Sequence, residues 1–516
     1  MNGSGKKKTA SGRMIVTFLL IIMQIVWLIL LVNKASNNMD WLSNIFQILS
    51  IVMALYIVNK DDVTAYRMGW VLLIVIAPVF GGLIYLIWGD KRASIFMRRK
   101  IDAGMEGIQE YLSQKPEAEQ AFRRAMPRAA GCAHYLSHRC GFPVWQNTAV
   151  KYYSLGDFQF PDILEELKKA EKFIFVEYFI IEEGLMWDSV LGILREKARE
   201  GVDVRIIYDD FGCLSKLPNG YDKELETMGI KCLRFNPFIP VVAVVMNNRD
   251  HRKMIVVDGN VAFTGGLNLA DEYINHRSRF GHWKDSGLML IGEAVWNFTA
   301  MFLQMWNAFR PGDKDIEQYM PHEEYEGQFE ADGYVQPFCD SPFDYEAVTV
   351  NLYTDMISRA KDYIFIFTPY LAISDEMSMA LRMAAKRGVD VRMAIPGIPD
   401  KKLTYRITRS YTIPLLRAGV RVYEYTPGFL HSKSYVCDDE TAIVGTVNSD
   451  YRSLYLQFEC GVLMSGNEAV LDVRDDALET FEVSHEVTFE ERIKTGFFGY
   501  LERAFDSVLK ILAPLF

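Results

Sequence analysis

Long apolar runs dominate the N-terminal part of the chain. Residues 14–33 contain no charge, and residues 69–88 form a second uncharged run that includes Pro78 and a glycine pair. A weaker apolar run, residues 41–58, lies between them and carries Ser, Asn and Gln. A helix of about 20 apolar residues crosses a hydrocarbon core of about 30 Å, and packed membrane helices tolerate proline and glycine. The pattern predicts a membrane anchor over residues 1–92, with candidate helices at these three runs.

The basic residues around these runs bear on the number of crossings. They precede the first run and follow the last one: Lys6, Lys7, Lys8 and Arg13, then Lys91, Arg92, Arg98, Arg99 and Lys100. Because basic flanks favour the cytoplasmic side, both groups there require an even number of crossings. Hydropathy favours three helices and charge favours two, so both numbers stay open. We expect a multi-pass protein of the cell membrane, with the rest of the chain on the cytoplasmic side.

Beyond residue 92 the pattern changes. Residues 93–140 are polar with helical spacing, which indicates a solvated connector. Strand-like and helix-like stretches then alternate: residues 172–181 predict a strand, residues 186–201 a helix that ends at Gly201, and residues 202–210 another strand. This order is a β-α-β unit, which is typical of a parallel sheet.

The same unit recurs further along the chain. A strand, a helix and a second strand are predicted at residues 362–371, 376–388 and 389–397. The chain is therefore predicted to be an α/β protein with two homologous lobes, at 141–330 and 331–516. We expect each lobe to have a mixed, mainly parallel sheet.

Size and composition narrow the function classes. A chain of 516 residues predicts about two or three domains. The formal net charge of −10 weakens the case for a nucleic-acid binder, because phosphate backbones are held by clustered Lys and Arg. Seven cysteines are more typical of a reducing compartment than of a disulfide framework. A zinc site at Cys132, His134, His138 and Cys140 has spacing too tight for the usual zinc knuckles.

One motif is written twice, with 180 positions between its copies. It reads H-x-K-x₄-D-x₆-G-x₂-N, and its defining residues are His251, Lys253, Asp258 and Asn268, then His431, Lys433, Asp438 and Asn448. In each copy, strand-like residues flank a turn at the aspartate, which predicts a hairpin. Residues two apart on a strand point to the same face, so each hairpin presents one imidazole and one ammonium together.

This pair of groups suits phosphoryl chemistry. A histidine can act as nucleophile or as general acid and base, while the lysine and the Asn268 or Asn448 amide hold the non-bridging oxygens. In-line displacement needs a nucleophile on one side of the phosphorus and a proton donor on the other, and two facing lobes supply both. The scheme requires no metal and no cofactor. The turn position of Asp258 and Asp438 favours a structural role for both aspartates.

These residues resemble the bacterial cardiolipin synthases of the phospholipase D superfamily. The resemblance rests on VEYFI, NNRDHRKMIVVDG, TGGLNLADEY, TPYLAISDE and LHSKSYVCDDETAIVGTVNSDYRSLYLQFE, and it covers the chain from about residue 42 onward. Two residues depart from the Gly-Ser that such proteins often carry before the asparagine: Gly266 in the first copy and Thr446 in the second. The two halves are therefore not expected to contribute equally.

The resemblance implies a two-step transfer. His251 or His431 attacks one phosphatidylglycerol, forms a phosphatidyl-histidine and expels glycerol, and a second phosphatidylglycerol then accepts the phosphatidyl group to give cardiolipin. It also implies that an acidic residue beyond each motif orients a histidine, at Asp285 and Glu459. A phospholipase D-type hydrolase and, less favoured, a membrane-anchored nuclease remain alternatives. The apolar tail at residues 497–516 suits either a membrane interface or packing on the catalytic lobes.

Overall fold

The computed structural model describes residues 40–60, 62–89, 92–237, 248–310, 316–320, 331–343, 346–493 and 496–515. These residues divide into two compact units. One holds the residues up to Met97 and those from Ser507 on, and the other holds 98–237 and 248–506. The candidate helix at residues 14–33 lies outside the described residues.

The first unit contains short helices in place of one long span at residues 69–88. Helix α2 covers Asp40–Val58, α3 covers Thr64–Ile76, α4 covers Pro78–Ile84, and a π-helical turn follows at Tyr85–Gly89. The prediction of a single helix at 69–88 is therefore wrong. Proline lacks the N–H that a helix interior needs and is well suited to the first helical position. In the described part of the chain, no helix is both long and apolar enough to cross a bilayer.

A close backbone approach accompanies this break. A Cβ on Gly81 would lie 2.6 Å from the carbonyl oxygen of Leu73, so only glycine allows α4 to run this close to α3. Ile57, Ile74 and Tyr85 form the small buried cluster of this unit.

The first lobe of the second unit is built on a seven-stranded sheet in the order β1-β8-β6-β5-β2-β3-β4. Its strands are β1 Thr148–Tyr153, β2 Phe173–Tyr178, β3 Asp203–Asp209, β4 Lys231–Phe235, β5 Lys253–Val257, β6 Val261–Gly265 and β8 Gly287–Gly292. The short strand β7, His282–Lys284, leaves this sheet and pairs elsewhere.

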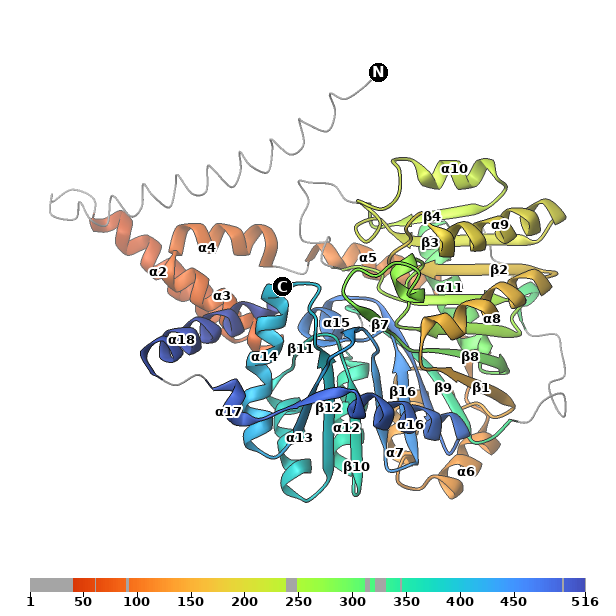
Figure 1. Cartoon of the computed structure of the whole chain (residues 1–516). Helices are drawn as coiled ribbons and strands as arrows, with labels where there is room; N and C mark the ends of the chain where they lie inside the picture. Colours follow the sequence, from red (N-terminus) through yellow and green to blue (C-terminus); the bar gives the residue numbers. More distant parts are fainter. Residues whose placement is uncertain are drawn as a thin grey trace. The chain divides into compact units, whose positions relative to one another are not determined.

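The second lobe repeats this order with one added strand. Its eight-stranded sheet runs β19-β13-β12-β10-β15-β16-β18-β9. These strands are β9 Tyr334–Asp340, β10 Tyr363–Phe367, β12 Asp390–Pro396, β13 Arg421–Tyr425, β15 Ser434–Cys437, β16 Thr441–Gly445, β18 Glu459–Ser465 and β19 Ser484–Val487. The matching strand orders confirm the two-lobe α/β architecture, and Figure 1 shows the yellow-green first lobe beside the cyan-blue second lobe.

The expectation of mainly parallel sheets is wrong. In the first lobe only the β2–β3 and β3–β4 pairs are parallel, and the pairs that link β1, β8, β6, β5 and β2 are antiparallel. The second lobe follows the same rule, with parallel pairs at β10–β12 and β12–β13. The β-α-β unit predicts its own strands correctly, but each motif hairpin joins the sheet antiparallel to the first strand of that unit, at β2–β5 and β10–β15. A short turn reverses the chain only within the hairpin.

Helices cover both sheets. In the first lobe α9, Leu185–Glu200, is capped at its C-terminus by Gly201, whose φ of +95° is the left-handed conformation that favours glycine. Its side chains Trp187, Val190 and Leu194 belong to the fully buried core on that face. The helices of this unit include α6 Pro116–Ala125, α7 Ala130–His134, α8 Gly156–Lys169, α9 Leu185–Glu200, α10 Tyr221–Thr227, α11 Val295–Phe309, α12 Val348–Arg359, α13 Asp375–Lys386, α14 Lys402–Arg417, α15 Tyr451–Leu456, α16 Glu468–Glu482 and α17 Phe489–Arg492. Helix α5 covers Arg92–Gly104 and α18 covers Gly496–Leu512.

Candidate active site

Each motif forms the predicted hairpin, and its aspartate ties the hairpin to the sheet. Asp258 has a φ of +54° at the turn between β5 and β6. Its carboxylate accepts three hydrogen bonds of 2.8 Å from the backbone N–H groups at Glu171, Lys172 and Phe173. The histidine precedes β5 and the aspartate follows it, so the two lie at opposite ends of the strand. Asp258 is thus a structural anchor of the hairpin.

Asp438 repeats this arrangement in the second lobe. Its φ is +53°, and its carboxylate accepts hydrogen bonds of 2.9 to 3.0 Å from the N–H groups at Lys361, Asp362 and Tyr363. Arg128 from the connector also donates to it at 2.7 Å.

A strand pair that crosses between the lobes places His431. Strand β14, Gly428–Leu430, pairs in parallel with β7, and Leu430 lies opposite Lys284. The His431 N–H then donates to the Lys284 carbonyl at 2.7 Å. The residue that follows β7 is Asp285, whose Oδ2 lies 2.6 Å from His431 Nδ1. The register of this pair therefore brings the first lobe's carboxylate to the second lobe's histidine.

The same arrangement recurs for His251 with the lobes exchanged. Asp250 and Phe458 form a parallel bridge, and the His251 N–H donates to the Phe458 carbonyl at 2.9 Å. One residue further on, both carboxylate oxygens of Glu459 lie 2.9 Å from His251 Nδ1. Both histidines thus bind a carboxylate of the opposite lobe through Nδ1, which leaves Nε2 of each ring for chemistry.

The two lysines lie beside their own histidines. Lys253 Nζ donates to the His251 carbonyl at 2.6 Å, and Lys433 Nζ donates to the His431 carbonyl. Both side chains are almost fully buried. Burial lowers the pKa of Lys253 to about 8 and that of Lys433 to about 7. Each ammonium sits in a desolvated site, where its attraction for a phosphate is stronger than in water.

The charged groups of the two motifs also interact across the lobes. Burial lowers the pKa of His251 well below its ordinary value, and both Lys253 and Lys433 lower it further. Burial also lowers the pKa of His431, to about 4, with contributions from Lys433 and Lys253. The pKa of each histidine is therefore lowered by the charge of the lysine in the other lobe as well as by that of its own lysine.

The two carboxylates differ in their charge state. Burial raises the pKa of Asp285, but the charges of Lys433 and His431 outweigh it and leave this pKa below the ordinary value. For Glu459, burial wins over Lys253 and the neighbouring hydroxyls, and its pKa is raised to about 8. Asp285 is thus an anion at neutral pH, whereas Glu459 holds a proton more readily.

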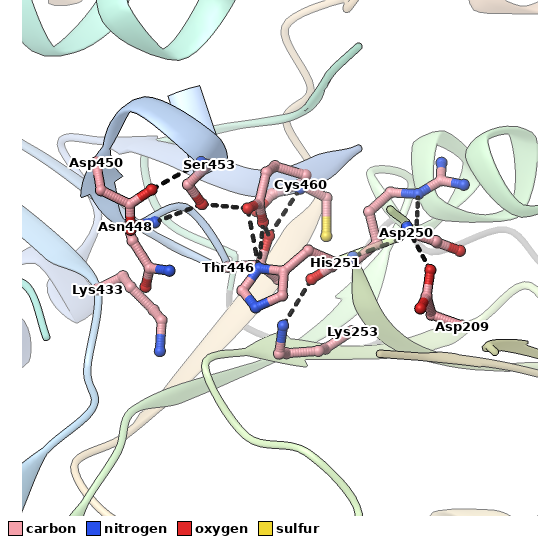
Figure 2. Close-up of polar contacts among 12 residues, drawn as sticks. Asp209, Asp250, His251, Lys253, Lys433, Thr446, Asn448, Asp450, Ser453 and Cys460 are labelled. Carbon is pink, nitrogen blue, oxygen red and sulfur yellow. Dashed lines mark hydrogen bonds and ion pairs between the residues drawn. The ribbon is translucent and has the colours of Figure 1, made fainter. Parts of the chain in front are cut away.

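Two hydroxyl groups hold Glu459. Thr446 Oγ1 and Ser453 Oγ each donate to one of its carboxylate oxygens, and Figure 2 shows both residues gathered beside the His251 ring. Ser453 also accepts the Asn448 N–H at 3.0 Å. Sequence reasoning noted that Thr446 departs from the Gly-Ser pattern but missed both contacts, since their partner lies on another strand.

The first lobe has Gly266 where the second lobe has Thr446. The position of Asp285 explains this difference. A Cβ on Gly266 would lie 1.9 Å from Asp285 Oδ1. The shorter aspartate occupies the space that Thr446 fills beside Glu459. The two halves therefore differ as a matched set, with Asp285 and Gly266 on one side and Glu459 and Thr446 on the other.

The two asparagines are also unequal. Asn268 is buried, its Oδ1 accepts the Ile180 N–H at 3.0 Å and its Nδ2 donates to the Tyr273 hydroxyl at 2.6 Å. Asn448 lies near Lys433 (Figure 2), and within the described residues its buried Oδ1 has no hydrogen-bond partner. Of the two amides, that of Asn448 therefore has more hydrogen-bonding capacity left for a ligand.

Aromatic rings surround His431 and were not predicted. The ring centroids of Tyr273 and Trp283 each lie 5.4 Å from it, and that of Phe429 lies 5.7 Å away. Phe179 packs against His251 at 4.9 Å. The signal available in the sequence was the run GHWKD, in which Trp283 precedes Asp285 by two residues.

The Cys and His cluster of the connector is not brought together as one set. His134 Nδ1 and His138 Nε2 bind the two oxygens of Glu119 at 2.8 and 2.9 Å, while Cys132 is buried. The ligand atoms of Glu119, His134 and His138 lie within 4.8 Å of one another. The hydrogen bonds of both rings to one carboxylate account for their approach.

Comparisons with known proteins agree with this geometry. The family model for the cardiolipin synthase PLD-like domain matches residues 163–306 and 353–479. The model for the phospholipase D-nuclease N-terminal region matches residues 48–89. A cardiolipin synthase of Alkalihalophilus pseudofirmus is 33% identical over 92% of this chain and 93% of its own. One of Geobacillus kaustophilus is 34% identical over 93% and 96%.

A solved structure shares the fold. The phosphatidylserine synthase of Haemophilus influenzae superposes with a TM-score of 0.52 at 14% identity, over 71% of this chain and 93% of that one. Taken with the family model, which covers more than half of the chain, the relatives show that the chain belongs to the family of cardiolipin synthases with PLD-like domains.

Proposed function

We propose that the chain transfers a phosphatidyl group between two phosphatidylglycerol molecules, which gives cardiolipin and glycerol. The observation that carries this proposal is the pair of cross-lobe contacts, His251 with Glu459 and His431 with Asp285. They give one buried site two imidazoles, each held at Nδ1 by a carboxylate and each with Nε2 available. That is what a displacement with a nucleophile and an acid on opposite sides of phosphorus requires.

The proposed reaction has two balanced steps. Nε2 of one histidine attacks the phosphorus, so that a P–N bond forms and the bond to the glycerol oxygen breaks. That oxygen takes a proton from Nε2 of the other histidine. The second imidazole, now neutral, removes the proton from a hydroxyl of another phosphatidylglycerol. The resulting oxygen attacks the same phosphorus, the P–N bond breaks, and the first imidazole is restored.

The lysines and one amide are proposed to hold the phosphate. Lys253 and Lys433 approach the site from opposite lobes, and a bound phosphodiester would share its non-bridging oxygens between them. Asn448 adds an amide on the second lobe. Asn268 acts mainly as a positioning residue, because its side chain is bound to the Ile180 backbone and to Tyr273. Asp258 and Asp438 support their hairpins and stay out of the chemistry.

The substrates place the protein at a membrane. We propose that the apolar N-terminal region anchors the chain in the cell membrane as a multi-pass segment, with the catalytic lobes at the cytoplasmic face. A bilayer lipid then reaches the site without leaving the interface. The exposed apolar side chains of α2, such as Ile48, Ile51 and Leu55, fit contact with lipid.

A product assay on reconstituted protein tests the proposal. Full-length chain in vesicles of phosphatidylglycerol should form cardiolipin and glycerol in equal amounts. Phosphatidic acid in place of cardiolipin would assign the chain as a hydrolase instead. His251→Ala and His431→Ala should each lower turnover by at least about 10³-fold.

The same variants distinguish the two histidine roles. The variant that lacks the histidine acting as proton donor should still form the phosphatidyl-histidine. Mass spectrometry of peptides prepared without acid can locate this group on the remaining histidine. The variant that lacks the nucleophile should form none. Near-full turnover in either variant would contradict the two-histidine scheme.

A further inference from the structure

Helix α18 presents its apolar side to solvent. Among its described side chains, six large apolar ones are at least half exposed: Phe497, Phe498, Tyr500, Leu501, Phe505 and Val508. Phe498 is 79% exposed. A surface helix of a globular protein normally turns its apolar stripe towards the core and its charges to water. This helix has the reverse orientation.

The polar side of α18 faces the second lobe. Gly499, Glu502, Arg503 and Asp506 follow helical spacing, and they line a cavity of about 320 Å³ together with residues of α14 and α17. Arg406 of α14 donates to Asp506 at 2.5 Å. The packing of α18 on the catalytic lobe thus uses charges, and it leaves Phe497, Phe498 and Tyr500 largely exposed.

The cavity is rich in cations although the chain as a whole is acidic. Lys402, Arg406, Arg409, Arg492 and Arg503 line it. Three acids also line it, namely Glu491, Glu502 and Asp506. Asp506 binds Arg406, and Glu491 accepts from the Thr488 N–H and binds His485. Excess cations in a chain of net charge −10 favour an anionic occupant.

Arg492 gives a second, independent indication of an anion. Its side chain is only 2% exposed, and one nitrogen, Nη2, donates to Glu424 at 2.6 Å. Within the described residues, its buried Nε and Nη1 have no hydrogen-bond acceptor. A desolvated guanidinium with unsatisfied N–H groups is costly, and a phosphate oxygen is the acceptor that matches its planar geometry.

We propose that the outer face of α18 lies in the bilayer interface and that the cavity behind it binds the phosphate of an anionic phospholipid, at a site apart from the catalytic histidines. An interfacial helix buries its apolar face about 5 to 10 Å deep at the headgroup boundary. Its polar face then lies at the depth of the lipid phosphates. The aromatic side chains and the basic cavity therefore recognise the same lipid layer. None of the residues that line the cavity belongs to the active site.

Amide exchange of the full-length chain in nanodiscs tests this site. Discs of phosphatidylcholine are compared with discs that also contain phosphatidylserine, an anionic lipid that is not the proposed substrate. Peptides that cover residues 402–413 and 496–506 should exchange roughly tenfold more slowly in the anionic discs. The result should be the same for His431→Ala protein, which separates this proposal from the proposed function.

Two matched pairs of variants complete the test. Lys402→Glu with Arg409→Glu should abolish the slowing by anionic lipid, whereas Lys361→Glu with Lys386→Glu makes the same charge change on exposed residues outside the cavity and should leave it intact. Phe497→Ser with Phe498→Ser should remove protection in both kinds of disc. Phe158→Ser, at a ring of the first lobe that is 59% exposed, should not. Arg492 is left intact, because it is buried and its loss would remove the shorter of the two ion pairs of Glu424.

Three outcomes would overturn the proposal. Equal exchange in the two kinds of disc would remove the anionic site. Equal slowing by inorganic phosphate in phosphatidylcholine discs would assign the cavity to a soluble anion. Slowing that depends on the number of chains per disc would assign the aromatic face to a second copy of the chain.

Discussion

His431 of the second lobe is bound by Asp285 of the first lobe, 146 positions away in the chain, with 2.6 Å between Nδ1 and Oδ2. The contact follows directly from the β7–β14 register, since Leu430 lies opposite Lys284. His251 and Glu459 repeat it from the other side across 208 positions. Each catalytic half therefore takes its orienting acid from the other lobe, and neither lobe holds a complete imidazole-carboxylate pair by itself.

Asp285→Asn should disable His431 selectively. The carboxylate raises the pKa of His431 against burial, so its loss should lower that pKa below about 4 and reduce turnover by about 10²-fold or more. Histidine titration by NMR and steady-state kinetics measure the two effects. Glu459→Gln is the control: it should disturb His251 and leave the His431 titration unchanged. If Asp285→Asn altered His251 instead, the cross-lobe pairing would be refuted.

Gly266→Ala should reduce turnover at least tenfold with little loss of fold. The new methyl group would lie 1.9 Å from Asp285 Oδ1 and displace the carboxylate from His431. Kinetics and the midpoint of thermal unfolding test this. Gly192→Ala in α9 is the matched control, because its Cβ meets nothing within 4 Å. It should stabilise the protein by about 0.5 to 1 kcal/mol and leave turnover alone.

Thr446→Val should reduce turnover by disturbing the contact of Glu459 with His251. Valine keeps the shape of threonine but removes the hydroxyl that donates to the carboxylate. We expect the pKa of Glu459, already about 8 because of burial, to rise, and turnover to fall about tenfold. Thr446→Ser keeps the hydroxyl and should restore most of the activity. Equal losses in both variants would mean that Thr446 contributes through packing alone.

Turnover should decline in mildly alkaline solution. Burial lowers the pKa of Lys433 to about 7 and of Lys253 to about 8, so both lose the positive charge that attracts phosphate as the pH rises through these values. A profile of kcat/KM from about pH 6 to about pH 9 reports groups of the free enzyme. Lys433→Arg stays charged throughout. The fall in kcat/KM near pH 7 should therefore be absent from the pH profile of its residual activity, while the fall near pH 8 remains. A flat wild-type profile would contradict the role of the lysines.

The same lysines affect stability with a definite sign. The folded-state pKa of Lys433 lies below its ordinary value of 10.5. Between about pH 7 and 10.5 the unfolded chain therefore binds more protons than the folded one, and the contribution of this residue to stability increases with pH. Activity and this part of the stability should thus move in opposite directions above neutral pH. Denaturant unfolding of wild type and Lys433→Met over that range measures the difference.

Asp476→Ala should be strongly destabilising. Asp476 of α16 binds Lys284 at 2.6 Å across the lobes, and both side chains are 6% exposed. It also accepts the Tyr152 hydroxyl at 2.7 Å. Removal of one partner leaves a buried ammonium, at a cost of about 3 to 5 kcal/mol. The free energy of unfolding from denaturant curves tests this, and the exposed neighbour Asp475→Ala should change it by less than about 0.5 kcal/mol.

Several features could be predicted from the sequence because they depend on neighbours in the chain. The hairpins follow from strand-like residues on both sides of a turn at Asp258 and Asp438, whose φ values of +54° and +53° match the predicted turns. The β-α-β units and the end of α9 at Gly201 are local patterns of the same kind. The duplicated motif then identified the two lobes and the chemistry of their side chains.

The features that were missed involve residues distant in the chain. The mainly parallel sheet was wrong, because the pairing of each motif hairpin with β2 or β10 has no local signal. The prediction of one helix at residues 69–88 was wrong because it treated Pro78 as a tolerated kink. In the structure one helix ends before Pro78 and another begins at it. The role of the Thr446 and Ser453 hydroxyls was missed, because it depends on their hydrogen bonds to Glu459, which the sequence does not show.

The sequence by itself indicated which groups the candidate site has. The duplicated motif supplied two histidines and two lysines, and the family resemblance implied the two acids. The tertiary structure decided which acid serves which histidine, how far burial shifts their pKa values and which face of α18 meets solvent. The physical reason is that propensity and periodicity act over a few residues. Partner choice, desolvation and exposure arise only when strands more than a hundred positions apart are brought into register.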